Sequence, residues 1–440
     1  MYRIAIIGGG FVGLPNAMKI ADILGPVFLF DKNENRLKQI KNGMFFSEGE
    51  ENKLDALVQQ QISQNKLVLS NNPNDLVYCN TFIICINYDL GERENEFNNL
   101  KSIFMEFLSL RKSERETMFI IQPTLPVGTI DRLISELRTE FQDHIDFNFD
   151  EQFLFTYCFE RIMPGEHYLE SINLYDRVYH SSTESAKEAY LKLEKKLGND
   201  LTDYVDFPNF KAVEFCKLAE NTYRAATIYL SHEFNVLARH YNVDVNQVIA
   251  EIKKRPTHSN IAWSGSSPGG YCLPKDFQLL LQNFSKDDTR IPWLSRLNQN
   301  FQDQDQFLFD WIDETLEKSQ CINCLIVGLN YKNDVEDDRN STGFKFLERF
   351  STIKRSIIKH GKTHIFSNCD VYENLNEFLE KNNPQHTALV IFNIQNASNL
   401  LSKNFKTIID CNSSLNEDNI ESIRSRSVSE YVKFGKWDFN

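Results

Sequence analysis

YRIAIIGGGFVG, residues 2–13, decides how the chain begins to fold. A short apolar run leads into a stretch that fits G-x-G-x-x-G, and a helix-like segment follows from Leu14 to Ile23. A strand, a glycine turn and a helix in this order direct backbone N–H groups and the positive end of the helix dipole toward a pyrophosphate. We therefore expect a dinucleotide site in a parallel α/β sheet. The turn residues expected to contact the cofactor are Gly8, Gly10, Phe11, Val12 and Gly13.

An acidic residue follows the second predicted strand. Residues 26–30 are apolar and end at Asp31, 18 residues beyond Gly13. A carboxylate at this place accepts hydrogen bonds from a ribose 2′-OH and repels a 2′-phosphate, so the pattern favours NAD over NADP. The alternative is a glycine-rich turn in an unrelated α/β unit.

The rest of the chain alternates between strand-like and helix-like segments. Residues 81–87 and 118–121 are expected strands, and this alternation is typical of a parallel sheet with crossover helices. Residues 209–241 lack Gly and Pro and predict one long helix that connects domains or forms a subunit interface. A second α/β unit begins at Cys321, with further strands expected at 363–366, 388–392 and 407–411.

Composition limits the possible functions. The 440 residues carry a formal net charge of −13, which argues against a general binder of nucleic acid or anionic membranes. Nine scattered cysteines suggest reduced thiols in a cytoplasm rather than a disulfide framework. The start is not a signal peptide, and no run approaches the roughly 18 apolar residues of a membrane span. No metal site is expected, since the pair Cys321 and Cys324 lacks a second pair or a His partner.

SPGGYCLPKD, residues 267–276, surrounds one cysteine with glycines and charges. Gly269 and Gly270 allow the chain to approach a ligand closely, and the cation of Lys275 favours the nucleophilic thiolate of Cys272. Cysteines are more often buried and inert, but the glycines and charged residues around Cys272 argue against that role here.

Three other residues have weaker local signals. Lys217 and Asn221 lie four apart on the predicted long helix, so they share a face and can hold an oxyanion, although a bland exposed pair is the alternative. Glu160 follows an apolar run, where a general base at the carboxyl edge of a sheet would stand. It could equally form a surface ion pair with Arg161.

In this order the motifs resemble those of the UDP-glucose/GDP-mannose dehydrogenase family, over nearly the whole chain. GGGFVGL is similar to the family's G-x-G-Y-V-G-L, PTLPVGT at 123–129 to S-T-V-P-x-G-T, and Phe159-Glu160-Arg161 to P-E-R. Lys217 and Asn221 match K-x-x-x-N, and GGYCLPKD resembles G-G-x-C-x-P-K-D. GLNYKND at 328–334 and RNS at 339–341 complete the set.

The resemblance implies a four-electron oxidation of a nucleotide sugar by NAD. Cys272 would attack the aldehyde, giving a thiohemiacetal and then a thioester that water hydrolyses. Lys217 and Asn221 would stabilise the oxyanion, and Glu160 would orient or deprotonate the water. Asp276 would assist proton transfer, while Thr124 would hold the water or the sugar hydroxyl. Lys275 and Arg339 would meet the cofactor or the diphosphate, and Lys332 would add to the local positive field.

The resemblance also implies two Rossmann-like parallel-sheet domains joined by a helical domain. The expected divisions are an NAD-binding domain at 1–200, a catalytic and dimerisation domain at 201–303, and a UDP-binding domain at 304–440. We expect a homodimer through the long helix, a role in surface polysaccharide precursor synthesis, and no nucleic-acid or membrane partner. The residues expected to contact the substrate are Glu160, Arg161, Lys217, Asn221, His258, Gly269, Gly270, Tyr331 and Lys332.

Several positions depart from the family pattern. Residues 86–89 replace V-P-T-P, Phe159 replaces a proline, and Tyr271 stands where Ser or His is usual. His258 stands where the family has a sugar-contacting arginine. Asn412 stands where the family's D-x-R motif, which begins here at Asp410, has its arginine. Chemistry residues are retained while substrate-reading ones differ, which suggests an altered sugar.

The E-R-x-x-P-G form at 160–165 resembles the branch of the family that acts on UDP-N-acetylhexosamines more than the UDP-glucose branch, which stays the alternative; GDP-mannose is less favoured. Two rival functions are a two-electron β-hydroxyacid-type dehydrogenase and a non-catalytic nucleotide-binding subunit.

Overall fold

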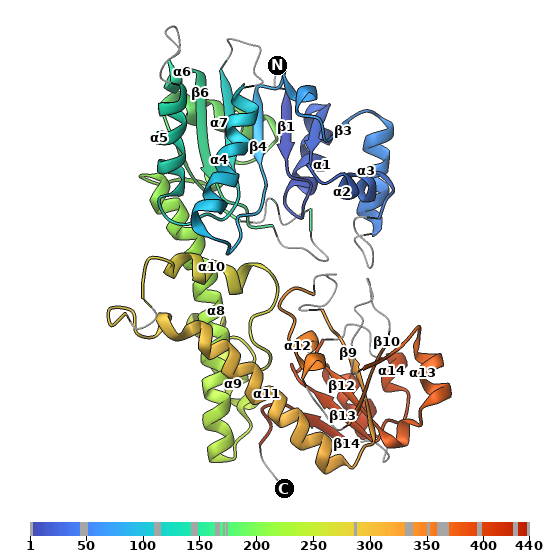
Figure 1. Cartoon of the computed structure of the whole chain (residues 1–440). Helices are drawn as coiled ribbons and strands as arrows, with labels where there is room; N and C mark the ends of the chain where they lie inside the picture. The colour runs from blue at the N-terminus through green and yellow to red at the C-terminus, as the bar shows by residue number, and fades with distance from the viewer. Residues whose placement is uncertain are drawn as a thin grey trace. The chain divides into compact units, whose positions relative to one another are not determined.

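The chain folds into two compact units, residues 1–220 and 221–440, in a computed structural model (Figure 1). The structure describes residues 3–44, 52–109, 116–141, 148–162, 168–169, 172, 175–285, 288–330, 338–349, 353–358, 369–393, 398–425 and 430–437. In both units a mostly parallel sheet forms the centre, as the sequence predicts.

The first unit is built on an eight-stranded sheet of order β3-β2-β1-β4-β5-β6-β7-β8. β1 pairs with both β2 and β4, and all strands from β3 to β6 run parallel. The strands are β1 (Ile4–Ile7), β2 (Val27–Phe30), β3 (Leu67–Ser70), β4 (Thr81–Ile84), β5 (Thr117–Ile121), β6 (Phe153–Cys158), β7 (Arg177–Ser181) and β8 (Tyr204–Asp206).

Crossover helices connect these strands and pack on the sheet (Figure 1). They keep the parallel strands buried on both faces, which explains the near-continuous apolar runs. The helices are α1 (Gly13–Leu24), α2 (Glu34–Lys41), α3 (Asn52–Ser63), α4 (Arg93–Ser109), α5 (Thr129–Phe141), α6 (Phe149–Gln152) and α7 (Glu184–Lys196).

The two faces of this sheet bury different kinds of side chain. One face packs aliphatic residues such as Ile83 and Ile120 against α1, α3 and α7. On the other, Phe82, Phe119 and Phe155 stack across β4, β5 and β6 with ring centroids 5.3 and 5.4 Å apart. The alternation of side chains along each strand produces this separation.

β7 reverses the direction of the sheet. It pairs antiparallel with β6, through Thr156↔Ser181, Tyr157↔His180 and Cys158↔Tyr179, while β8 runs parallel to β7. The amino end of β7 therefore lies at the same edge of the sheet as the carboxyl end of β6.

α8 (Phe210–Tyr241) is a 32-residue helix that carries the chain from the first unit into the second. It starts one residue later than the predicted long helix, whose end is confirmed. The other helices of the second unit are α9 (Val245–Lys253), α10 (Cys272–Leu281), α11 (Leu297–Ser319), α12 (Thr342–Glu348), α13 (Leu375–Lys381), α14 (Ser398–Leu401) and α15 (Glu417–Arg424).

The second unit holds a six-stranded, fully parallel sheet of order β11-β10-β9-β12-β13-β14. Its strands are β9 (Asn323–Val327), β10 (Lys354–Ile358), β11 (Cys369–Tyr372), β12 (Thr387–Ile391), β13 (Thr407–Asp410) and β14 (Glu430–Lys433). Two apolar clusters enclose it, one including α11 and α12 and the other including α13 and α15.

Most predicted strands are present with small boundary changes. β4 stops at Ile84, short of the predicted end at residue 87, although the Cys85 N–H still donates to the Ile7 carbonyl at 2.8 Å. The predicted strand at 363–366 lies outside the described residues. Within the described ranges, no helix combines the length and apolar character of a membrane span.

Candidate active site

The glycine turn after β1 is closed so tightly that side chains are excluded from it. Gly8 has φ +105°, and a Cβ on Gly13 would lie 1.8 Å from the Gly8 carbonyl oxygen. The Gly9 N–H donates to Asp31 Oδ2 at 2.8 Å, which joins the turn to the end of β2. The turn and the acid, the two features of a dinucleotide fingerprint, therefore meet at one edge of the sheet.

α1 begins directly after this turn and suits a pyrophosphate. Its N-cap residue Val12 makes no side-chain cap, so no side chain of that residue competes for the first N–H groups of the helix. A Cβ added to Gly10 would meet no atom within 4 Å, which leaves open space beside the turn. These residues fit NAD, with Asp31 at the place of the ribose acceptor.

Glu160 lies just beyond β6 and is ion-paired inside the protein. Its Oε2 lies 2.9 Å from Nη1 of Arg177, and the two side chains are only 4% and 10% exposed. The β6–β7 register continues to this pair, because two further residues beyond Cys158↔Tyr179 bring Glu160 opposite Arg177. The sequence-based alternative of a surface ion pair with Arg161 is wrong, since Arg161 pairs with Glu220 at 2.9 Å.

Burial and charge act against each other at Arg177. Burial, the largest single influence, lowers the pKa of its guanidinium, but Glu160 together with Cys158, Tyr190 and Glu194 raises that pKa well above its ordinary value. Arg177 is thus a permanent cation facing Glu160.

Lys217 approaches the same strand end from α8. Its Nζ lies 5.4 Å from the ring centroid of Phe159, and the Arg161 guanidinium lies 5.0 Å from the same ring. The phenylalanine that replaces the expected proline thus serves as a platform for two cations. Lys217 and Glu160 belong to adjoining segments of one unit.

The loop that carries Thr124 is held by the side chain of an acidic residue that the sequence interpretation missed. Thr124 follows β5 and is half-buried. Farther along the loop, fully buried Glu214 of α8 accepts the N–H of Gly128 at 2.5 Å and of Ile130 at 2.8 Å. Glu214 therefore caps α5 from a distant part of the chain.

Cys272 is the first residue of α10, and its side chain is exposed. A thiol at the amino end of a helix is favoured as the thiolate, because the helix dipole and free N–H groups stabilise a negative charge there. The expected alternative, an inert thiol in an apolar interior, does not describe this cysteine.

The charged residues after Cys272 are buried. Lys275 is 5% exposed, and its Nζ lies 2.8 Å from Oδ1 of fully buried Asp276. Asn221 of α8 donates its side-chain amide to the other oxygen of Asp276. The structure thus brings together Asn221, Lys275 and Asp276, three of the predicted site residues.

Tyr271 gathers two cations next to the thiol. The Lys275 Nζ lies 5.2 Å and the Arg339 guanidinium 4.5 Å from its ring centroid. The backbone of Gly270, at φ +77°, donates to the Arg339 carbonyl at 2.9 Å and accepts from the Asn340 amide at 2.8 Å. Arg339 and the cysteine loop are therefore one local arrangement.

Residues 265–267 of this loop are fixed by several partners. Asn412 accepts the Ser266 N–H at 2.7 Å, and Asp305 accepts the Ser267 N–H at 3.1 Å. A Cβ on Gly265 would lie 2.3 Å from Asn412 Oδ1. Asn412, which stands where the family motif has an arginine, therefore holds this loop in place.

The remaining predicted substrate residues are less informative. His258 lies in a 3₁₀ turn, Pro256–His258, with an exposed side chain whose Nδ1 is 2.9 Å from Thr257 Oγ1. Gly269 is half-buried before Gly270. Tyr331 and Lys332 lie outside the described residues, as do Pro164 and Gly165 of the E-R-x-x-P-G segment.

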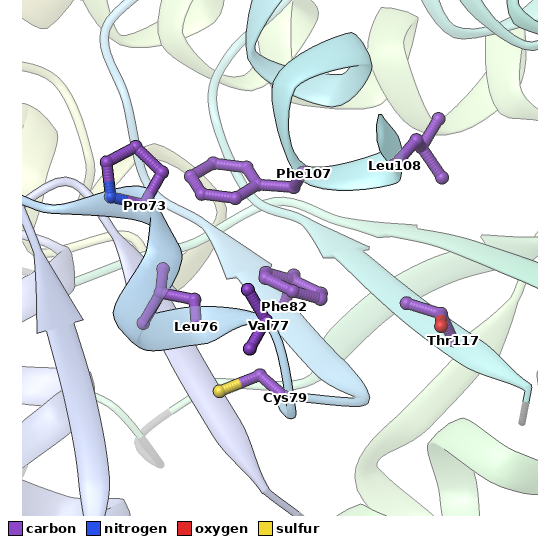
Figure 2. A pocket seen from close by; sticks show the side chains of 8 residues that line it. All are labelled: Pro73, Leu76, Val77, Cys79, Phe82, Phe107, Leu108 and Thr117. Carbon is purple, nitrogen blue, oxygen red and sulfur yellow. The ribbon is translucent and has the colours of Figure 1, made fainter. Parts of the chain in front are cut away.

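An apolar depression in the first unit is not part of this site (Figure 2). It lies near the amino ends of β4 and β5, whereas the glycine turn and Glu160 lie at the carboxyl ends of the strands. No charged side chain lines it, so it offers nothing to hold a diphosphate. The lining residues are Pro73, Leu76, Val77, Cys79, Phe82, Phe107, Leu108 and Thr117.

Comparisons with known proteins agree with this geometry. The family model for the NAD binding domain of the UDP-glucose/GDP-mannose dehydrogenase family matches residues 2–196. The model for the central domain of the same family matches residues 211–300.

Individual relatives match over most of their length. The chain is 30% identical to the UDP-N-acetyl-D-mannosamine dehydrogenase of Pyrococcus horikoshii over 369 residues, 82% of this chain and 83% of the relative. It is 28% identical to the enzyme of that name from Methanocaldococcus jannaschii over 356 residues, 79% of this chain and 76% of the relative.

Solved structures show the same fold. A structure of UDP-D-ManNAc dehydrogenase from Pyrococcus horikoshii aligns with a TM-score of 0.77 at 26% identity, covering 99% of this chain and 100% of that one. UDP-N-acetyl-mannosamine dehydrogenase from Staphylococcus aureus aligns with a TM-score of 0.77 at 20% identity, covering 98% of each chain.

Proposed function

Because the chain belongs to the UDP-glucose/GDP-mannose dehydrogenase family, we propose that it oxidises the C6 alcohol of a UDP-N-acetylhexosamine to a carboxylate. It is an NAD-dependent nucleotide-sugar 6-dehydrogenase. The single observation that carries the four-electron proposal is the exposed thiol of Cys272 at the amino end of α10.

UDP-N-acetylmannosamine is the favoured substrate. Several relatives of this chain bear names that specify this sugar, and the sequence favours the N-acetylhexosamine branch independently through its E-R-x-x-P-G segment. UDP-glucose is the alternative.

NAD, when bound, supplies the hydride acceptor for both oxidations. The glycine turn and the first N–H groups of α1 would hold its pyrophosphate, and Asp31 would accept from its ribose. We assign Thr124, Lys275 and Arg339 to the surroundings of the cofactor or of the substrate diphosphate.

The protein's part in the second oxidation is to hold the aldehyde covalently. The Cys272 thiolate would attack C6 of the aldehyde, forming a C–S bond while the carbonyl electron pair moves to oxygen and takes a proton. Loss of hydride and proton from this thiohemiacetal gives a thioester. Lys217 and Asn221, one turn apart on α8, would stabilise the negative oxygen in these steps.

Hydrolysis then releases the product. Water would attack the thioester carbon, the C–S bond would break, and the thiolate of Cys272 would leave. Glu160 would orient this water and accept its proton, with Thr124 helping to hold it. Asp276, which accepts a hydrogen bond from Asn221 and is ion-paired with Lys275, would assist proton transfer.

We further propose the three-domain division at 1–200, 201–303 and 304–440, with the last part binding UDP through residues that include Tyr331 and Lys332. The substrate contacts would also include Arg161, His258, Gly269 and Gly270. The product would serve surface polysaccharide synthesis.

We propose that the active form is a homodimer joined through α8. Tyr223, Leu230 and Leu237 are exposed apolar side chains at intervals of seven residues, and Tyr241 continues the same stripe. Such a stripe on a long helix suits a second copy of the same helix. The nine free cysteines favour a reducing compartment such as the cytoplasm.

NADH stoichiometry with defined sugars tests the function. We expect two NADH per sugar with UDP-N-acetylmannosamine, measured beside UDP-glucose, UDP-GlcNAc, UDP-GalNAc and GDP-mannose. Cys272→Ser should lower carboxylate formation by at least about 1000-fold, because it removes the covalent nucleophile.

The rival functions give different results in the same assay. One NADH per sugar, with no effect of Cys272→Ser, would indicate a β-hydroxyacid-type dehydrogenase. Sugar binding without NADH formation would indicate a non-catalytic subunit.

A further inference from the structure

Donors from two strand ends and from α1 converge on one oxygen of Glu160. Oε2 accepts from Arg177 Nη1 at 2.9 Å, from Gln122 Nε2 at 3.3 Å and from Asn16 Nδ2 at 3.5 Å. Arg177 is the first residue of β7, Gln122 directly follows β5, and Asn16 lies in the first turn of α1. The other oxygen, Oε1, accepts the backbone N–H of Arg161 at 3.1 Å.

The orientation of the Gln122 amide is itself determined by its neighbours. Cys85, just beyond β4, donates its thiol to Gln122 Oε1 at 2.9 Å. Burial, followed by the nearby Glu160 charge, raises the pKa of Cys85 well above its ordinary value, so this thiol stays protonated and remains a donor. With Oε1 of Gln122 occupied as an acceptor, its Nε2 is directed at Glu160.

Asn16 completes the arrangement from the cofactor side. Its Nδ2 donates to the Val12 carbonyl at 2.9 Å and reaches Gln122 Oε1 at 3.4 Å. Asn16, Gln122, Glu160 and Arg177 are all less than 10% exposed. A charged carboxylate at such burial needs fixed donors, because water cannot solvate it.

We infer that Arg177, Gln122 and Asn16 are positioning residues that saturate Oε2 of Glu160 and leave Oε1 as the oxygen that acts on the hydrolytic water. This assignment rests on the proposed function of Glu160. The donors to Oε2 and the Arg161 N–H that donates to Oε1 fix the plane of the carboxylate, so Oε1 can meet a water in only one orientation.

Pre-steady-state kinetics of Arg177→Met test the assignment. Both hydride transfers precede hydrolysis, so the variant should still release two NADH per active site in a first burst. Its steady-state turnover should then fall about 100-fold, because a misplaced base slows only the attack of water. Arg177→Lys should recover about tenfold of this loss, and Arg138→Met, which removes an exposed arginine of α5 from its pair with Asp150, should match the native enzyme.

Hydroxylamine provides a readout that general structural damage would not give. It attacks a thioester without help from a base, so it should raise the turnover of Arg177→Met at least about tenfold and yield the sugar hydroxamate. The native enzyme should change less than about twofold.

Equal slowing of the burst and of steady-state turnover, or no hydroxylamine effect on a folded variant, would overturn the inference. If Arg177→Met does not fold, the same measurements on Gln122→Met test the inference. Its steady-state turnover should fall about tenfold. A native enzyme that forms no NADH would instead show that the proposed function is wrong, which is a different result from equal slowing of the burst and of turnover in Arg177→Met.

Discussion

The two sheets share one strand order but differ at their carboxyl edges. Both follow the plan in which the first strand lies centrally, between the second and the fourth. In the first sheet, Glu160 is bonded to residues from distant strands and from α1. In the second, buried Asp410 accepts the N–H groups of Ser414 and Leu415, which lie in its own loop, and the hydroxyl of Tyr431 on the neighbouring strand.

This difference shows what topology does and does not decide. In parallel α/β sheets of this strand order, ligands bind outside the carboxyl ends of the strands. The loops at that edge decide whether a buried acid is bonded to distant elements, as Glu160 is, or mainly to its own loop, as Asp410 is.

Gly13→Ala should prevent the first unit from folding stably. Its Cβ would overlap the Gly8 carbonyl oxygen at 1.8 Å, so the cost should exceed about 4 kcal/mol. Gly10→Ala is the matched control, because its Cβ would meet no atom within 4 Å. It should keep its melting temperature and weaken NAD binding. Circular dichroism melts and NAD titration measure the two effects, and equal stability of the two variants would contradict the packing argument.

Glu214→Gln should flatten the pH dependence of stability in the first unit. Burial raises the pKa of Glu214 from 4.5 to about 8, so folding takes up a proton between these values and stability falls as pH rises through them. The loss between pH 5 and pH 7 is about 2 kcal/mol. Urea unfolding at both pH values measures it. An unchanged difference in Glu214→Gln would show that this carboxyl is not responsible.

His232→Gln should have a similar but opposite effect in the second unit. Burial lowers the pKa of His232, which is 4% exposed on α8, from 6.5 to about 4. The neutral ring is favoured in the folded state, so stability falls as pH drops from about 6.5 toward 4. Between pH 7 and pH 5 this amounts to about 2 kcal/mol, slightly less than for Glu214. Hydrogen exchange of α8 and α11 amides at the two pH values should show the loss in the native chain and not in the variant.

The sequence predicted those features whose signals are local. The glycine turn, Asp31 and the Cys272 loop each occupy a few consecutive residues, and their chemistry depends on neighbours in the chain. The structure places the turn beside Asp31 and exposes the thiol, as expected.

The sequence did not predict the partners of Glu160. Arg177 is 17 residues away and starts a strand whose direction is reversed, which a pattern of apolar residues does not reveal. Glu214 was missed for a similar reason, since its partners are backbone N–H groups 84 and 86 residues earlier. Neither relationship leaves a periodic signal.

The reversed strand β7 makes the Glu160–Arg177 pair sensitive to chain length. Side chains alternate between the two faces of a sheet, so deleting or inserting one residue between Tyr179 and Arg177 would turn the guanidinium to the opposite face although the arginine itself is kept. We therefore expect a change of chain length to preserve the pair only if it falls in the connection that precedes Arg177.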